Sequence, residues 1–286
     1  MRRITVLLSA LLVTSMLIAQ NSGTSIAKAK IIMGTKNFFG PQEINKALNI
    51  KIDTTVITPV PFSEKELERA KSLGLILILR LPISIDSLNK VLKGRLPNNS
   101  QLLQNYDLKE GRMQKKTWYI DEDWFTKAES DKPYWALSSN KFIAASNNKT
   151  YLQQSSQLAN YLKTKVFAGL DTLPEPYRSA ICELDSLRPI IENIGNSKED
   201  KKRREVLLQS LEINQLCRPS PVNVVYDLAI MFNTTRVRNF ANTTIMTNIV
   251  GIFVGYFDET GLIIDRVLAD DNNEEMGCTF NQKPQR

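Results

Sequence analysis

The residues best suited to chemistry in this sequence are carboxylates that stand close together in the stretch YIDEDWF. They are Asp121, Glu122 and Asp123. Two carboxylates held about 5–10 Å apart can hydrolyse a glycosidic bond, and Asp121 and Asp123 are the catalytic candidates under a glycan-hydrolase hypothesis. The structural interpretation of the same acids, which we favour, is a helix start capped by Asp121 with Trp124 and Phe125 turned inward.

Aromatic side chains are concentrated in the same segment, since all three tryptophans of the chain fall between positions 118 and 135. An aromatic ring offers a flat apolar face with polar edges, which suits a sugar or a peptide. The candidate ligand-binding residues are Trp118, Tyr119, Trp124, Tyr134 and Trp135. The alternative is that these rings form the core of a loop-rich lobe. Weighing the two, we expect Trp118 and Trp135 to be largely buried and Trp124 to be partly exposed.

The chain has no histidine, and this absence restricts its chemistry. Ser-His-Asp and Cys-His catalysis within the chain are excluded, as are histidine-ligated zinc and iron sites. The acidic run DDNNEE at 270–275 lacks the spacing and the glycine of an EF-hand loop, so a solvated turn is preferred to a calcium site. No nucleotide-binding loop and no nucleophile elbow is present. The sequence predicts neither a metal nor a cofactor, and it leans against an enzyme.

The first third of the chain, which must help to position these residues, carries clear signals for helices and a strand. The stretch NFFGPQEINKAL opens a helix at its Gly-Pro pair, and its two phenylalanines are expected to pin the helix onto the core. The stretch PFSEKELERAKSLG has a capping box at Ser63 and Glu66 and ends at Gly74. The apolar run LILILRL after Gly74 is typical of a strand buried on both faces.

The remainder of the chain is predicted to be mainly helical and to end in β-structure. Helices are expected over 86–94, 150–167, 176–194 and 197–216 and from 221 onward, with a strand in YWALSSNKFIAA. The stretches IVGIFVGYF and LIIDRVLA, joined by DETG, predict a C-terminal antiparallel β-hairpin. The predicted fold class is α+β, helix-dominated, with a buried strand after Gly74. Residues 30–286 are expected to form one domain, and 168–176 is where two lobes would meet.

The first 29 residues have the plan of a secretory signal peptide. Arg2 and Arg3 precede an apolar segment, and an A-x-A cleavage site ends at Ala29. The segment is short for a membrane anchor, which needs about 20 residues. Cleavage after Ala29 is preferred, and an uncleaved anchor or a true start at Met33 are the alternatives. Cleavage would lower the net charge from +7 to +4, which is too mild to indicate nucleic-acid binding.

Three cysteines, Cys182, Cys217 and Cys278, are spaced too widely for a disulfide framework or a zinc knuckle. One disulfide with one buried thiol and three buried thiols both fit the sequence. The basic run KEDKKRRE that begins at Lys198 is interpreted as a solvated first helical turn.

Five short motifs occur in a fixed order along the chain: NFFG, PFSEKEL, YWALSS, RPSPVNVVYDL and GYFDETG. In this order they resemble a family of uncharacterised bacterial proteins with no known activity. The resemblance spans most of residues 37–278 and implies a bacterial source, but it supplies no catalytic residues. It also implies that the N-x-S/T sequons at Asn98, Asn148, Asn233 and Asn242 are accidental.

Three functions are compatible with these observations. The leading hypothesis is a secreted or envelope-associated, non-catalytic protein that binds another protein or a cell-envelope component, with no nucleic acid and no membrane span after processing. The second is a carboxylate-dependent glycan hydrolase acting on cell-envelope sugar. The third is a cytoplasmic protein of mobile-element origin that starts at Met33.

Overall fold

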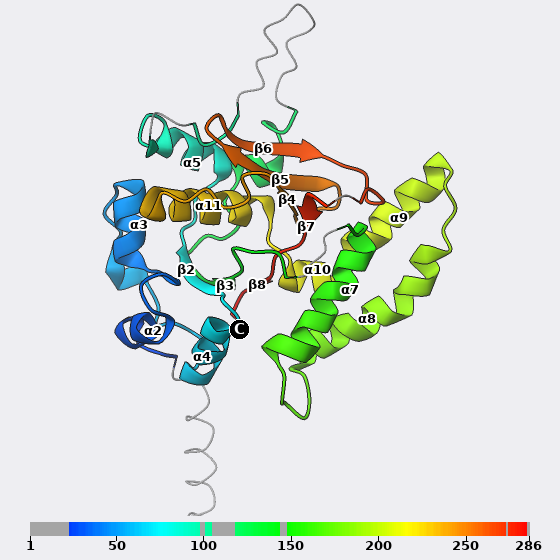
Figure 1. Ribbon diagram of the computed structural model, residues 1–286, viewed down its shortest axis with the longest axis horizontal. Helices are drawn as coiled ribbons and strands as arrows, with labels where there is room; N and C mark the ends of the chain where they lie inside the picture. The colour runs from blue at the N-terminus through cyan, green and yellow to red at the C-terminus, as the bar shows by residue number, and fades with distance from the viewer. Residues whose placement is uncertain (1–22, 98–100, 105–117, 144–147, 273, 285–286) are drawn as a thin grey trace, which may run out of the picture.

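The computed structural model describes residues 23–97, 101–104, 118–143, 148–272 and 274–284 (Figure 1). The helices are α2 (Ile26–Met33), α3 (Pro41–Leu48), α4 (Glu64–Ser72), α5 (Ile85–Leu92), α6 (Asp123–Thr126), α7 (Tyr151–Tyr161), α8 (Glu175–Glu192), α9 (Lys198–Ser210), α10 (Glu212–Cys217) and α11 (Pro221–Thr235). The strands are β1 (Phe38–Phe39), β2 (Ile76–Arg80), β3 (Tyr134–Ser138), β4 (Thr244–Met246), β5 (Ile252–Asp258), β6 (Gly261–Arg266), β7 (Met276–Gly277) and β8 (Asn281–Gln282). The chain is therefore an α+β protein, as the sequence predicted.

The strands form two four-stranded sheets in the described part of the chain. The first sheet has the order β1-β2-β3-β8, with β1 parallel to β2 and the other pairs antiparallel. The second has the order β6-β5-β4-β7, with β7 parallel to β4 and the other pairs antiparallel. The predicted C-terminal hairpin is confirmed as β5 and β6. Since β7 and β8 lie in different sheets, the C-terminal segment ties the two sheets together.

The turn of this hairpin matters for the site, because β6 carries Arg266. Asp258 pairs with Gly261 across the turn, and the Asp258 carboxylate accepts a hydrogen bond from the backbone N–H of Thr260 at 2.7 Å. Gly261 has φ +118°, and a Cβ there would lie 2.7 Å from the backbone of Leu103. Only glycine meets both conditions without strain.

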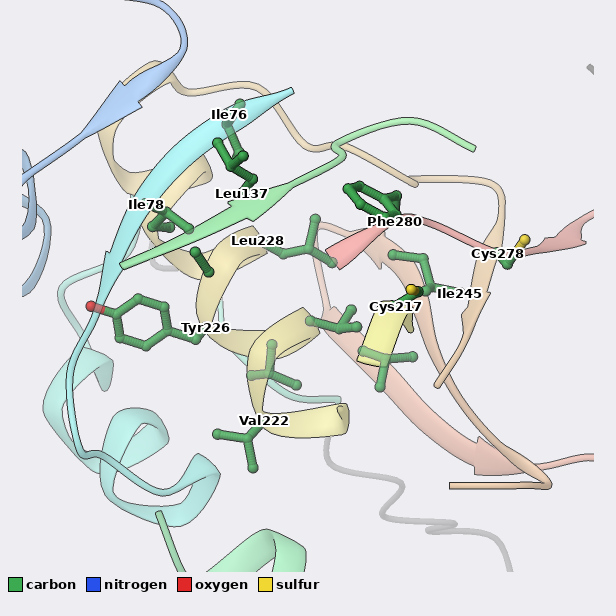
Figure 2. Packing of buried hydrophobic residues seen from close by; sticks show 14 of the residues in the cluster. Ile76, Ile78, Leu137, Cys217, Val222, Tyr226, Leu228, Ile245, Cys278 and Phe280 are labelled. Carbon is green, nitrogen blue, oxygen red and sulfur yellow. The ribbon is translucent and has the colours of Figure 1, made fainter. Parts of the chain in front are cut away.

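Helix α11 contacts both sheets and is buried on all sides from Pro221 to Phe232 (Figure 2). The Tyr226 hydroxyl donates a hydrogen bond to the Leu79 carbonyl of β2 at 3.1 Å. On the side of the second sheet, the Phe232 ring meets Phe257 of β5 with centroids 5.0 Å apart. A helix that is apolar all round belongs in a core, so α11 forms the centre of the fold.

A buried ion pair fixes α11 to the first sheet. Arg80 donates from Nε to Asp227 Oδ1 at 3.0 Å and from Nη2 to Oδ2 at 2.6 Å. Ser138 Oγ donates to the same Asp227 Oδ2 at 2.8 Å, and Arg80 Nη1 donates to Asn281 Oδ1 at 2.8 Å. The two charged side chains are only 2% and 7% exposed. The pair therefore joins α11 to β2, β3 and β8.

A second buried arginine, Arg218, fixes the helices α7 and α10 to the second sheet. Its guanidinium stacks 4.0 Å from the centroid of the Tyr151 ring. All five of its N–H donors are satisfied by uncharged acceptors: the side chains of Asn214, Gln154 and Ser155 and the carbonyls of Tyr151 and Met246. Helices α7 to α9 lie on the opposite side of the molecule from α2 and α3 (Figure 1).

Helix α2 is part of the fold, although the sequence analysis assigned its first residues to a signal peptide. Thr24 Oγ1 donates a hydrogen bond to the Phe62 carbonyl at 2.7 Å, and Ala29 and Met33 are buried against the core. Lys30 pairs with Glu43 of α3 at 2.7 Å. The expected cleavage position after Ala29 thus lies inside this helix, and a chain that started at Met33 would lack it.

The structure breaks one predicted helix and confirms another. The helix expected over 197–216 is broken at Leu211, whose backbone is non-helical (φ −59°, ψ 114°) and whose side chain is fully buried. This break lets α10 turn inward, where Ile213 packs into the core. Helix α8 matches the helix predicted over 176–194, and it continues through Pro189 to Glu192. In the residues that the structure covers, no helix is both long and apolar enough to cross a bilayer.

All three cysteines are free thiols. Cys182 is exposed, whereas Cys217 and Cys278 are buried. Burial raises the pKa of the Cys278 thiol to about 11, although the nearby Arg218 acts in the opposite direction. Neither interpretation of the cysteines from sequence matches this arrangement, because α8 turns Cys182 away from the core.

Candidate functional site

An open cleft of about 630 Å³ lies beside the aromatic segment, and Trp118 and Trp124 line it. The opposite walls come from α9, from residues 249–252 at the start of β5 and from the end of β6 with the loop that follows. The residues at 249–252 are apolar, Glu205 and Asp271 contribute carboxylates, and Arg266 contributes a guanidinium. The cleft therefore combines two aromatic rings with both signs of charge.

The two cleft tryptophans rest on a buried aromatic layer. The Tyr119 ring lies 5.4 Å from Trp118, 6.0 Å from Trp124 and 5.1 Å from Phe125, measured between centroids. Tyr119 and Phe125 are buried, whereas both tryptophans are half-buried. Burial, together with the negative charge of Asp265, raises the pKa of Tyr119 to about 12. Tyr119 is thus a neutral support for the tryptophans and not a surface for a ligand.

Arg266 holds both an aromatic ring and a carboxylate at the cleft. Its guanidinium carbon lies 3.9 Å from the centroid of the Trp118 ring. Its Nη2 lies 3.3 Å from Glu122 Oε1. A cation over an aromatic face at an exposed site is worth about 0.5–1 kcal/mol, so Arg266 orients Trp118 and Glu122 and connects them to the hairpin.

The carboxylates in the cleft are not those that the sequence analysis selected. Asp121 and Asp123 are exposed outside the cleft lining, and Asp123 pairs with Lys127 at 2.9 Å. The carboxylates that do line the cleft belong to Glu122, Glu205 and Asp271. Glu122, rather than Asp121, is the N-cap of α6.

Tyr134 and Trp135 are separated from the other three candidate ligand-binding residues. Trp135 is fully buried in β3, where its ring packs 5.8 Å from Phe38 and its Nε1 donates to the Thr58 carbonyl at 3.1 Å. The Tyr134 hydroxyl donates to Asn223 Oδ1 at 2.9 Å. Two of the five candidates therefore stabilise the fold. Trp118 is more exposed than expected, because it packs against rings at the cleft and not into the sheet.

Glu129 lies beside Tyr134 in a second polar cluster that the sequence did not indicate. Ser220 Oγ donates to Glu129 Oε2 at 2.7 Å, and Lys283 forms an ion pair with Oε1. Burial by itself would raise the pKa of Glu129, but Lys283, Ser220 and Arg80 outweigh it and hold the pKa below its usual range. This cluster connects the start of α11 to the end of β8.

Comparison of the chain with protein-family models, with curated proteins and with solved structures gives no match. The five ordered motifs lie on structural elements: NFFG contains β1, PFSEKEL starts α4, YWALSS contains β3, RPSPVNVVYDL starts α11 and GYFDETG forms the turn of β5 and β6. Their residues have roles in packing and capping in this fold. The resemblance that they carry stays a prediction, and the function must be argued from the cleft.

Proposed function

We propose that this protein is a non-catalytic binding protein that takes a carbohydrate of the cell envelope into the cleft beside Trp118 and Trp124. The observation that carries the proposal is the pair of half-buried tryptophans on one wall of an open cleft. A flat aromatic ring packs against the C–H face of a sugar, and its polar surroundings hydrogen-bond the hydroxyls. The volume of 630 Å³ falls within the range of about 300–1,000 Å³ that is usual for small-molecule sites.

The other side chains of the cleft suit hydroxyl recognition. Glu122, Glu205 and Asp271 supply acceptors, and Arg266 supplies donors. Two of the acceptors are already oriented, because Glu122 is held by Arg266 and Asp271 accepts a hydrogen bond from the Leu268 backbone at 3.1 Å. Preorganised acceptors of this kind lower the cost of ordering a polar ligand.

The proposal includes export, which rests on the N-terminal charge and apolar segment of the sequence. Residues from Thr24 onward make buried contacts, so cleavage before Gly23 would leave helix α2 intact, whereas cleavage after Ala29 would cut it. The proposal therefore places the cleavage before Gly23.

Binding of the purified protein to polysaccharide isolated from a bacterial envelope tests the proposal. Trp118→Ala and Trp124→Ala should each weaken binding by about twofold to tenfold, since packing on an aromatic ring contributes roughly 0.5–1.5 kcal/mol beyond the area it buries. Phe142→Ala is the matched control, because Phe142 is a half-buried aromatic that packs on Phe240 outside the cleft. Wild-type binding by both tryptophan variants would contradict the proposal.

The same material should be assayed for the release of reducing ends, which separates binding from hydrolysis. A binding protein releases none. Release that is lost in Glu122→Gln or Glu205→Gln would replace the binding proposal by the hydrolase alternative, acting through carboxylates of the cleft and not through Asp121 and Asp123.

A further inference from the structure

A second cavity lies between α4 and the segment that joins α7 to α8, apart from the aromatic cleft. Its volume is about 240 Å³. Its floor is made by Leu75 and Leu137, which are buried at the first sheet, and one wall is the ring of Phe167. The Phe167 ring is supported from behind by Tyr177, with centroids 4.9 Å apart. The cavity is thus a formed apolar pocket and not a gap between loosely packed helices.

A polar residue, Gln282, also lines the pocket. Gln282 pairs through its backbone register with Leu137 in the first sheet, and only 5% of the residue is exposed. Its side-chain amide lines the pocket and forms no hydrogen bond with any described residue. Because the amide has no internal partner in the described part of the chain, its N–H₂ can donate to a polar group that is brought into the pocket.

Two cations stand at the rim of the same pocket. Lys65 and Arg69 are four residues apart on α4, so they share one face of the helix. Arg69 Nη2 donates to the Ala168 carbonyl at 2.5 Å, and neither cation forms an ion pair within the described residues. Glu66 lies in the same lining, but its carboxylate accepts from the Ser63 backbone and hydroxyl, each at 2.7 Å, and forms no ion pair with either cation among the described residues.

We propose that this pocket binds a small apolar carboxylate of the medium-chain fatty-acid class. The apolar body lies against Leu75, Leu137 and Phe167, and the carboxylate accepts hydrogen bonds from the Gln282 amide and from the rim cations. A carboxylate has enough lone pairs to accept from more than one of these donors at once. The volume lies below the range of about 300–1,000 Å³ for drug-sized ligands, which selects a short chain. This site is independent of the aromatic cleft and of the function proposed for it.

Titration of the full chain with octanoate by isothermal titration calorimetry tests the proposal. Lys65→Gln combined with Arg69→Gln should weaken octanoate binding by about tenfold or more, because hydrogen bonds between charged partners are the strong ones. The control is Lys51→Gln combined with Lys71→Gln, which removes two exposed cations that do not line the pocket and should leave the affinity unchanged.

Two further titrations test how much the apolar chain of the ligand and the charge of its carboxylate contribute to binding. Val166→Phe fills the pocket and should abolish binding, with a thermal melt to show that the variant is folded. Octan-1-ol should bind the wild type more weakly than octanoate does, and the Lys65→Gln, Arg69→Gln variant should not change its affinity. The proposal is overturned if octanoate does not bind, if the control pair loses as much affinity as the rim pair, or if a folded Val166→Phe variant binds normally.

Discussion

Asp227→Asn should lower the free energy of unfolding by about 3–5 kcal/mol, the cost of breaking a buried ion pair by removing one partner. The substitution keeps the shape of the side chain but removes the only negative charge that Arg80 contacts directly among the residues that the structure describes. It also places an amide N–H₂ where either an Arg80 donor or Ser138 now finds an acceptor. With the Arg80 side chain only 2% exposed, water cannot replace the lost acceptor. The expected loss is a large part of the roughly 5–15 kcal/mol by which domains are stable.

Urea unfolding followed by circular dichroism measures this loss. Asp86→Asn is the control, because it removes an exposed ion pair with Lys90 on α5, and pairs of that kind contribute about 0.3–0.5 kcal/mol. Replacing both Arg80 and Asp227 by apolar residues should restore much of the stability, since no buried charge is then left unpaired. The reasoning is refuted if Asp227→Asn costs no more than Asp86→Asn.

Three further outcomes follow from the structure. A chain that begins at Gly23 should have the melting temperature of the full chain. A chain that begins at Lys30 lacks the first half of α2 and should melt at least about 5 °C lower, because 1 kcal/mol of lost stability corresponds to roughly 2–4 °C in a chain of this size. Equal melting temperatures would contradict the role of α2. Because the pKa of Glu129 is lowered by folding, its charge stabilises the protein above the unfolded value of about 4.3, and this stability is lost as the pH falls through the lower folded pKa. Glu129→Gln should therefore be less stable than the wild type at pH 7 and equally stable at about pH 2, and no difference at pH 7 would count against the cluster. With a thiol reagent, Cys182 should react at once and the two buried thiols only after unfolding, so a second fast thiol would be unexpected.

Elements marked by local chemistry could be predicted from the sequence. The capping box at Ser63 and Glu66 is present in α4, with the Glu66 backbone N–H donating to Ser63 Oγ at 3.3 Å. The run after Gly74 becomes β2, which is buried along its whole length. The DETG turn joins β5 and β6. In each case the residues that carry the sequence pattern lie within the element that they predict. The element can therefore be predicted without knowing which distant residues contact it.

The short strands and the buried ion pair could not be predicted, because their partners are distant in sequence. Strand β8 has two residues and pairs with β3, and Arg80 meets Asp227 across 147 positions. Two residues have no detectable periodicity, and a lone arginine or aspartate does not indicate its partner. Helix α2 was missed for another reason: its alanines and isoleucines resemble the end of a signal peptide.

The candidate site was predicted in part. The aromatic segment was identified from composition, but composition cannot separate rings that line a cleft from rings that fill a core. Trp135 lies on β3 and packs on Phe38, whereas its neighbour Tyr134 points to the opposite face, toward Asn223 of α11, as alternation along a strand requires. Glu205 and Asp271 reach the cleft from α9 and from the loop after β6, and only the tertiary fold brings them to Trp118.

Acrylamide quenching of tryptophan fluorescence tests most directly whether the tryptophan cleft is a ligand site. Variants that keep a single tryptophan, Trp118, Trp124 or Trp135, are compared without and with soluble fragments of envelope polysaccharide. Trp118 and Trp124 should be quenched in the free protein and protected when the fragments are added, while Trp135 stays protected throughout. If Trp118 and Trp124 are as protected as Trp135 in the free protein, or if the fragments leave their quenching unchanged, the cleft is not the binding site.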